Sequence, residues 1–134
     1  MKQRGLTLLE VLISLGLVAI ALIAIVTVFL TGLRSTRVKE QTAVATDLCR
    51  QVLERSKGLG GLPTSTMIFD GSVPTAAVGG FPPGPYPGTQ VDGQQYVLRV
   101  DVKPKAGEPD VYIVHVSARW SVHRVDAESL MYAI

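Results

Sequence analysis

Glu10 is the side chain near the start of this chain whose type and setting most clearly point to chemistry. It is the only charged residue between positions 6 and 33, in a run of 28 residues that contains no proline. Insertion of a carboxylate at membrane depth is unfavourable by about 2.5–3.5 kcal/mol, so an acid placed there marks a functional site by default. We therefore expect Glu10 to have a specific cationic or hydrogen-bonding partner.

The run that surrounds Glu10 has the length of a membrane-spanning helix. At about 1.5 Å per residue, residues 6–33 would extend roughly 42 Å, which exceeds a hydrocarbon core of about 30 Å. A secretory signal would have an apolar region of only about 7–15 residues. Lys2 and Arg4 precede the run, which favours a cytoplasmic N-terminus and translocation of the C-terminal part of the chain. We expect residues 1–5 to be a leader and residues 6–33 a transmembrane helix.

The helical pattern continues beyond the apolar run, into residues 34–57. Its apolar positions follow helical spacing, and Gly58 and Pro63 provide stop signals. The sequence predicts one helix from near Leu6 to near Lys57, whose second half is amphipathic and packs on a domain core. The apolar positions of that second half are Val38, Ala45, Leu48, Val52 and Leu53.

Residues 58–93 are rich in glycine and proline and are predicted to be a connecting loop at the surface. The stretch from Phe81 to Gly88 contains four prolines, which rules out a helix or a central strand there. Thr66–Phe69 could form one short strand. Two interpretations stay open, because the segment could be a plain connector or a recognition surface for a partner.

Residues 94–134 alternate in polarity and predict an antiparallel β-meander, so the fold class is α+β. Strands are expected over Gln95–Val102, Val111–Val122 and Ser129–Ile134, with residues 123–128 as a polar connection. One face of the sheet would pack on the amphipathic part of the helix. In the second strand, the residues expected to share that face are Tyr112, Val114, Val116, Ala118, Trp120 and Val122.

Charge and cysteine content exclude several classes of function. Without the leader, the chain carries 11 basic and 11 acidic residues, which argues against nucleic-acid binding as its main activity. Arg34, Arg37 and Lys39 could still form a local DNA-contacting patch, although a solvated helix face is the preferred interpretation. Cys49 is the only cysteine, so an intramolecular disulfide is impossible. We expect it to be a small apolar residue on a helix face, with an intermolecular disulfide as the alternative.

No arrangement of residues predicts catalysis, a cofactor or a metal site. His115 and His123 fit no common zinc spacing. We expect Trp120 to lie in the core rather than to stack on a ligand. No nucleophile, base and acid arrangement can be read from the sequence. The acids near the turns of the β-region match no calcium-loop pattern; they are Asp92, Asp101, Glu108 and Asp110.

Residues 5–11, Gly-Leu-Thr-Leu-Leu-Glu-Val, resemble the processing and assembly motif of type IV pilins and type II secretion pseudopilins. The resemblance implies cleavage after Gly5 by a prepilin peptidase and N-methylation of the new N-terminus, Leu6. It also implies that Glu10 is the assembly glutamate. The physical chemistry agrees, since the ammonium that cleavage creates on Leu6 could pair with Glu10 of a neighbouring subunit and fix its register. Thr7 could bond back to the helix backbone or help to cap the start of the helix.

The resemblance is closest to minor components of such filaments. Thr27 stands where major pilins have a proline, and the cysteine pair of many major pilins is absent. The chain is thus expected to be a non-enzymatic structural subunit, a minor pilin of a type IV pilus. Its partners would be the prepilin peptidase, other pilins, the assembly platform and the inner membrane, before it reaches the periplasm or a surface pilus. The alternatives are a minor pseudopilin of a type II secretion system and a membrane-anchored DNA- or ligand-binding module that does not polymerise.

Overall fold

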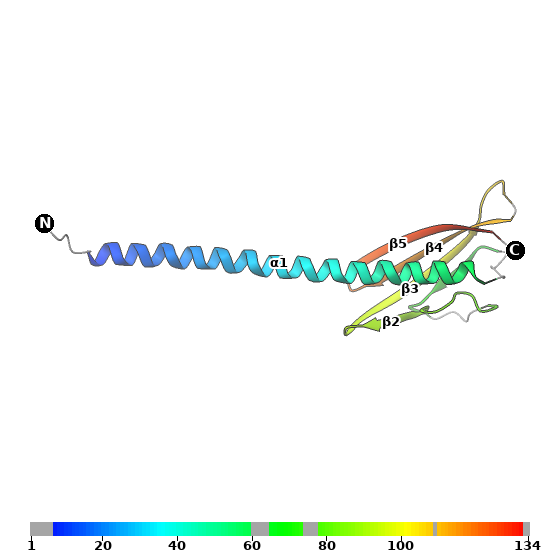
Figure 1. The fold of residues 1–134 in the computed structure, drawn as a ribbon, viewed down its shortest axis with the longest axis horizontal. Coiled ribbons are helices and arrows are strands. Elements are labelled where there is room, and N and C mark those ends of the chain that lie inside the picture. Colours follow the sequence, from blue (N-terminus) through cyan, green and yellow to red (C-terminus); the bar gives the residue numbers. More distant parts are fainter. Residues whose placement is uncertain (1–6, 60–64, 74–77, 109, 133–134) are drawn as a thin grey trace. The chain divides into compact units, whose positions relative to one another are not determined.

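A computed structural model describes residues 7–59, 65–73, 78–108 and 110–132 of the chain. The chain forms two compact units, Met1–Glu40 and Gln41–Ile134. Helix α1 (Leu8–Lys57) is one α-helix of 50 residues that begins in the first unit and ends in the second (Figure 1). The prediction of a single helix from near Leu6 to near Lys57 is therefore confirmed.

Backbone hydrogen bonds and charged side chains stabilise both ends of α1. The carbonyl oxygen of Thr7 accepts hydrogen bonds from the N–H groups of Glu10 (3.0 Å) and Val11 (3.2 Å). At the other end, Gly58 donates its N–H to the carbonyl oxygen of Arg55 at 3.2 Å, a tightened final turn. The acid in the first turn and the basic residues in the last turn, Arg55 and Lys57, have the signs that the helix dipole favours.

The second unit contains a five-stranded antiparallel sheet in which β3, β4 and β5 form a meander, as predicted (Figure 1). Neighbouring strands run in the order β1-β3-β4-β5, and β2 also pairs with β3. The strands are β1 (Met67–Asp70), β2 (Gly88–Val91), β3 (Gln94–Pro104), β4 (Val111–Trp120) and β5 (His123–Tyr132).

Strands β1 and β2 share one edge of β3, and Leu98 of β3 joins them. The carbonyl oxygen of Leu98 accepts a hydrogen bond from the N–H of Gly71 at 2.8 Å, and its own N–H donates to the carbonyl oxygen of Pro87 at 2.9 Å. Because both backbone groups of one strand residue point to the same edge, the chain after β1 and the chain before β2 meet there. Asp92 and Gly93, with φ of +49° and +77°, form the tight turn between β2 and β3.

The core of the second unit lies between the last part of α1 and one face of the sheet. Alternate residues of β3 and β4 point inward, which confirms the period-two pattern. The amphipathic pattern of the helix is confirmed from Ala45 on, but Val38 is exposed. The buried helix residues are Ala45, Leu48, Cys49, Val52, Leu53 and Ser56, and the fully buried large side chains of the sheet include Phe69, Tyr96, Leu98, Val100, Val102, Val114 and Val116.

The structure differs from the predictions in two strands and in one loop. Residues 123–128, expected to be a polar connection, form the first half of β5, and Val122 lies in the turn before it with its side chain 90% exposed. Strand β2 was not predicted within the glycine- and proline-rich segment. Phe81 and Pro82, expected on a surface loop, are buried, and the ring of Phe81 packs edge-on against Phe69 with centroids 5.5 Å apart.

Candidate functional site

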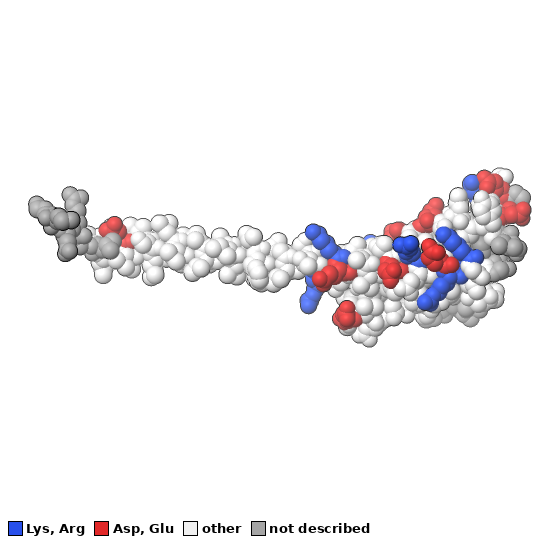
Figure 2. Space-filling model, in the orientation of Figure 1, with Lys and Arg blue, Asp and Glu red and all other residues white. Residues whose placement is uncertain are grey.

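Glu10 lies in the first turn of α1, and its side chain is exposed. From Leu8 to Leu33 it is the only charged residue, and Figure 2 shows one acidic position on an otherwise uncharged stretch at the start of the helix. The apolar side chains of this stretch are exposed as well. The isolated charge that the sequence indicated is therefore carried on a regular helix whose surface is otherwise apolar.

The other polar side chains of this stretch are satisfied within the helix. The hydroxyl groups of Ser14, Thr27 and Thr31 donate to the carbonyl oxygens one turn earlier, at 2.7, 2.9 and 2.9 Å. Such bonds let hydroxyl side chains enter an apolar environment without an external partner. The carboxylate of Glu10 differs from these hydroxyl groups. It forms no hydrogen bond or ion pair with any residue that the structure describes.

Thr7 and Glu10 have the Thr-x-x-Glu spacing of a capping box. The hydroxyl oxygen of Thr7 accepts a hydrogen bond from the backbone N–H of Glu10 at 3.4 Å, as expected of a helix cap. In a complete capping box the carboxylate would return to the N–H of Thr7. The structure contains only the first of these bonds, so the carboxylate of Glu10 is left for another partner.

Gly5 and Leu6, the predicted cleavage position and methylated N-terminus, lie outside the described residues. The first described residue is Thr7. The structure therefore places the assembly candidate Glu10 but does not bear on the two processing candidates.

A family model for the prokaryotic N-terminal methylation motif matches residues 1–32 of the chain. The chain thus carries the motif of prepilin-type precursors. The motif supports a type IV pilin or pseudopilin precursor, and the long helix with its antiparallel sheet is a pilin-like α+β architecture. No curated protein and no solved structure matches the chain.

Helix α1 is also the one helix in the described residues that is long and apolar enough to cross a membrane. Its most apolar window has a mean hydropathy of 3.0, and no residue of that window is buried. The helix lies near the N-terminus, next to the motif. Together these features fit a membrane-anchored precursor.

The two histidines and Trp120 do not come together as a ligand site. His115 lies on β4 with Nε2 3.3 Å from Oδ1 of Asp126. The ring of His123 instead lies tilted against Trp120, with 5.6 Å between the ring centroids. Trp120 is buried and donates its indole N–H to Oε1 of Gln41 at 3.3 Å, which confirms the prediction of a core residue.

The acids considered for calcium are spread over the sheet and its turns. Asp101 pairs with Arg99 at 3.0 Å, and Glu108 pairs with Lys105 at 2.6 Å. No group of three histidine, cysteine or carboxylate side chains in the described part of the chain could hold a metal ion. Asp101 and Glu108 thus belong to two separate ion pairs rather than to one cluster of acids.

The basic residues considered for DNA contact lie on one part of α1. Arg34 and Arg37 border a shallow hollow on the helix, together with Leu33, Thr36 and Glu40. The acid Glu40 is part of the same surface, so its charge offsets that of the arginines. This mixture fits a solvated helix face better than a track for a polyanion.

Proposed function

We propose that this chain is a minor pilin, a structural subunit of a type IV pilus. In this proposal a prepilin peptidase cuts after Gly5, Leu6 is N-methylated, and the helix then leaves the inner membrane for the filament. The precursor has its N-terminus in the cytoplasm, and the second unit is translocated. The observation that carries the proposal is the carboxylate of Glu10, which has no partner among the described residues, on an apolar stretch whose hydroxyl groups (Ser14, Thr27 and Thr31) are satisfied within the helix.

Glu10 is the assembly residue in this mechanism. Cleavage creates an ammonium on Leu6, and in a bundle of such helices the ammonium of one subunit meets the carboxylate of its neighbour. A buried charge without a partner is unfavourable by several kcal/mol, whereas a paired and hydrogen-bonded charge is tolerated. Only the register that joins the two groups avoids this cost, so the pair selects the axial position of each incoming subunit.

Substitution at Glu10 tests this mechanism directly. Glu10→Gln keeps the size of the side chain and removes its charge, so it should insert into the membrane normally and be lost from filaments. Loss of one partner of a buried pair costs about 3–5 kcal/mol, which corresponds to at least a hundredfold fall in incorporation. Incorporation is measured by immunoblotting of sheared pili against the membrane fraction.

Ser14→Ala is the matched control, because the Ser14 hydroxyl only bonds its own helix one turn back. It should assemble like the natural chain. Normal incorporation of Glu10→Gln, or equal loss in both variants, would contradict the pairing mechanism. Mass spectrometry of the mature chain should show loss of residues 1–5 and a methyl group on Leu6, and an intact leader would remove the proposal altogether.

The methylation motif supports a pilin and a pseudopilin alike, so a minor pseudopilin of a type II secretion system is the alternative. The two differ in where the mature chain is found. Recovery in sheared surface pili supports the minor pilin, whereas absence from pili combined with loss of protein secretion on deletion supports the pseudopilin. A chain that is never processed or polymerised would instead be a membrane-anchored binding module.

A further inference from the structure

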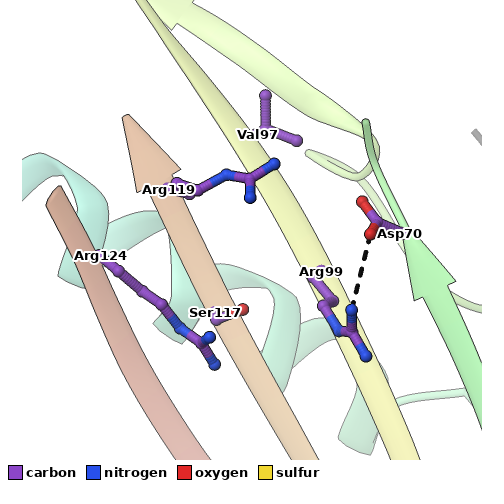
Figure 3. Close-up of a pocket in the computed structure, with 6 residues that line it drawn as sticks. All are labelled: Asp70, Val97, Arg99, Ser117, Arg119 and Arg124. Carbon is purple, nitrogen blue, oxygen red and sulfur yellow. Dashed lines mark ion pairs between the residues drawn. The ribbon is translucent and has the colours of Figure 1, made fainter. Parts of the chain in front are cut away.

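The face of the sheet that points away from α1 carries a small hollow of about 80 Å³. It lies entirely within the second unit and is formed by residues of β1, β3, β4 and β5 (Figure 3). Three of its lining residues are arginines, each from a different strand. The lining residues are Asp70, Val97, Arg99, Ser117, Arg119 and Arg124.

The strand register places two of these arginines at directly opposite positions. Arg119 of β4 lies directly opposite Arg124 of β5, and Arg99 of β3 lies opposite Ser117 of β4. Like charges at directly opposite positions of an antiparallel pair destabilise the sheet. A cross-strand pair of arginines is therefore unfavourable unless an anion lies between or beside them.

The acids nearby neutralise only two of the three arginines. Arg99 pairs with Asp101 at 3.0 Å and with Asp70 at 3.6 Å, and Arg124 pairs with Asp126 at 2.6 Å. Arg119 forms no ion pair with any residue that the structure describes. Its side chain reaches over β3 toward the hollow (Figure 3).

Asp70 is the one acid among the described residues of the wall, and the pKa of its carboxyl is lowered. Its pKa is lowered chiefly because the Ser72 hydroxyl and the Ser72 N–H, at 2.9 Å, donate to the carboxylate, and Arg99 and Arg119 add a smaller effect. The wall holds three arginines and one acid, while Asp101 and Asp126 on the same face balance Arg99 and Arg124. The charge of Arg119 is therefore the one that a bound anion would neutralise.

We propose that this hollow binds a phosphate group, offered as inorganic phosphate or as a terminal phosphomonoester. Arginine presents planar forks of N–H donors that match phosphate oxygens, and charge-assisted bonds of this kind are the stronger ones. The Ser117 hydroxyl, which also lines the hollow, adds a fourth donor (Figure 3). Donors on several sides suit the oxygens of a tetrahedral anion better than the two coplanar oxygens of a carboxylate.

The acidic surroundings favour a compact anion over a polymer. Asp101 and Asp126 flank the arginines on the same face, so an extended polyanion would meet repulsion beyond the hollow. A single compact anion beside Arg119 meets fewer of these acids than a polymer that extends past the hollow. The ligand class is therefore a small phosphate, independent of whether the chain assembles into filaments.

The test is titration of the full chain in nonionic detergent with inorganic phosphate at constant ionic strength, followed by the amide NMR shifts of Ser117 and Arg119. Saturable shifts are expected. Arg119→Gln should weaken binding about tenfold or more, while the control Arg50→Gln, an exposed helix arginine, should leave it unchanged. Arg124→Gln provides a second variant of the hollow, and unchanged amide shifts elsewhere report that each variant is folded.

Three further ligands, glycerol phosphate, acetate and dimethyl phosphate, test which kind of molecule supplies the phosphate group. Equal binding of phosphate and glycerol phosphate supports a phosphorylated solute, and preference for inorganic phosphate supports the free ion. Acetate or dimethyl phosphate binding as tightly as phosphate would overturn the proposal, because neither is a tetrahedral dianion. Absence of saturable shifts, or equal weakening by Arg119→Gln and Arg50→Gln, would overturn it as well.

Discussion

At the scale of a single residue, Cys49 shows how burial in the second unit lowers the reactivity of a thiol. Its side chain is fully buried on the inner face of α1, in agreement with the expectation of a small apolar residue on a helix face. Burial raises the pKa of the thiol to about 11, because the surroundings disfavour the charged thiolate. A thiol that is both protonated and inaccessible is a poor partner for an intermolecular disulfide, the alternative that the sequence left open.

Cys49 should therefore resist alkylation as long as the second unit is folded. At pH 8 an ordinary thiol, with a pKa near 8.5, is partly ionised and reacts readily with iodoacetamide. We expect at least a hundredfold slower labelling in the folded chain than in denaturant, measured by intact mass against time. The fluorescence of the buried Trp120 reports which state is being labelled. Comparable labelling rates in both states would contradict the burial of the thiol.

The candidate site residues differ in how far a sequence can reveal them. Glu10 is visible because it is the one charge in a long apolar run, and a local pattern is enough to single it out. Arg99, Arg119 and Arg124 are separated in sequence, and only the pairing register brings them to one hollow. Residues that meet through register cannot be identified until the strand partners are known.

At the scale of elements, the helix and the strands with a strong periodic pattern were predicted correctly, whereas strands with a weak pattern were missed. The first half of β5 was missed because its outward residues Arg124 and Asp126 are charged, and its inward residues Val125 and Ala127 are small. Strand β2 was missed although the turn signal Asp92-Gly93 comes directly after it, because the preceding prolines suggested a loop throughout. The proline-rich composition around β2 therefore predicted a loop, although pairing with β3 stabilises a strand there.

Gly71 is the element-scale position whose substitution should be most damaging. A Cβ there would overlap the carbonyl oxygens of Pro87 and Leu98, where the ends of β1 and β2 meet on β3. Gly71→Ala should therefore destabilise the second unit by about 1–3 kcal/mol, or roughly 4–8 °C in Tm for each kcal/mol. The measurement is thermal unfolding of the full chain in detergent, followed by near-ultraviolet circular dichroism.

Gly58→Ala is the matched control for that comparison. A Cβ at Gly58 would have its nearest neighbour, the Arg55 carbonyl oxygen, at an ordinary contact distance of 3.6 Å. Its Tm should change by no more than a few degrees. If Gly71→Ala were as stable as Gly58→Ala, the close approach of β1 and β2 along β3 would be wrong.

At the scale of the whole molecule, the two units differ in whether their apolar side chains are exposed or buried. The described part of the first unit has an exposed apolar surface, whereas the second unit has a buried core of its own. Every residue of that core lies between Ala45 and Met131. A chain with this division can keep one unit in a membrane or a bundle of helices while the other stays in water.

The core implies that residues 41–134 fold without the first 40 residues. This fragment should be monomeric in water and unfold cooperatively, as followed by circular dichroism and analytical ultracentrifugation. A second fragment, residues 58–134, should not fold, because it lacks the buried helix residues Leu48, Val52 and Leu53. Each such side chain contributes roughly 1.5–3 kcal/mol, and the net stability of a domain is only about 5–15 kcal/mol. Cooperative unfolding of the shorter fragment would show that the sheet does not need α1. Failure of the longer one would mean that the second unit depends on residues 1–40 or on neighbouring subunits.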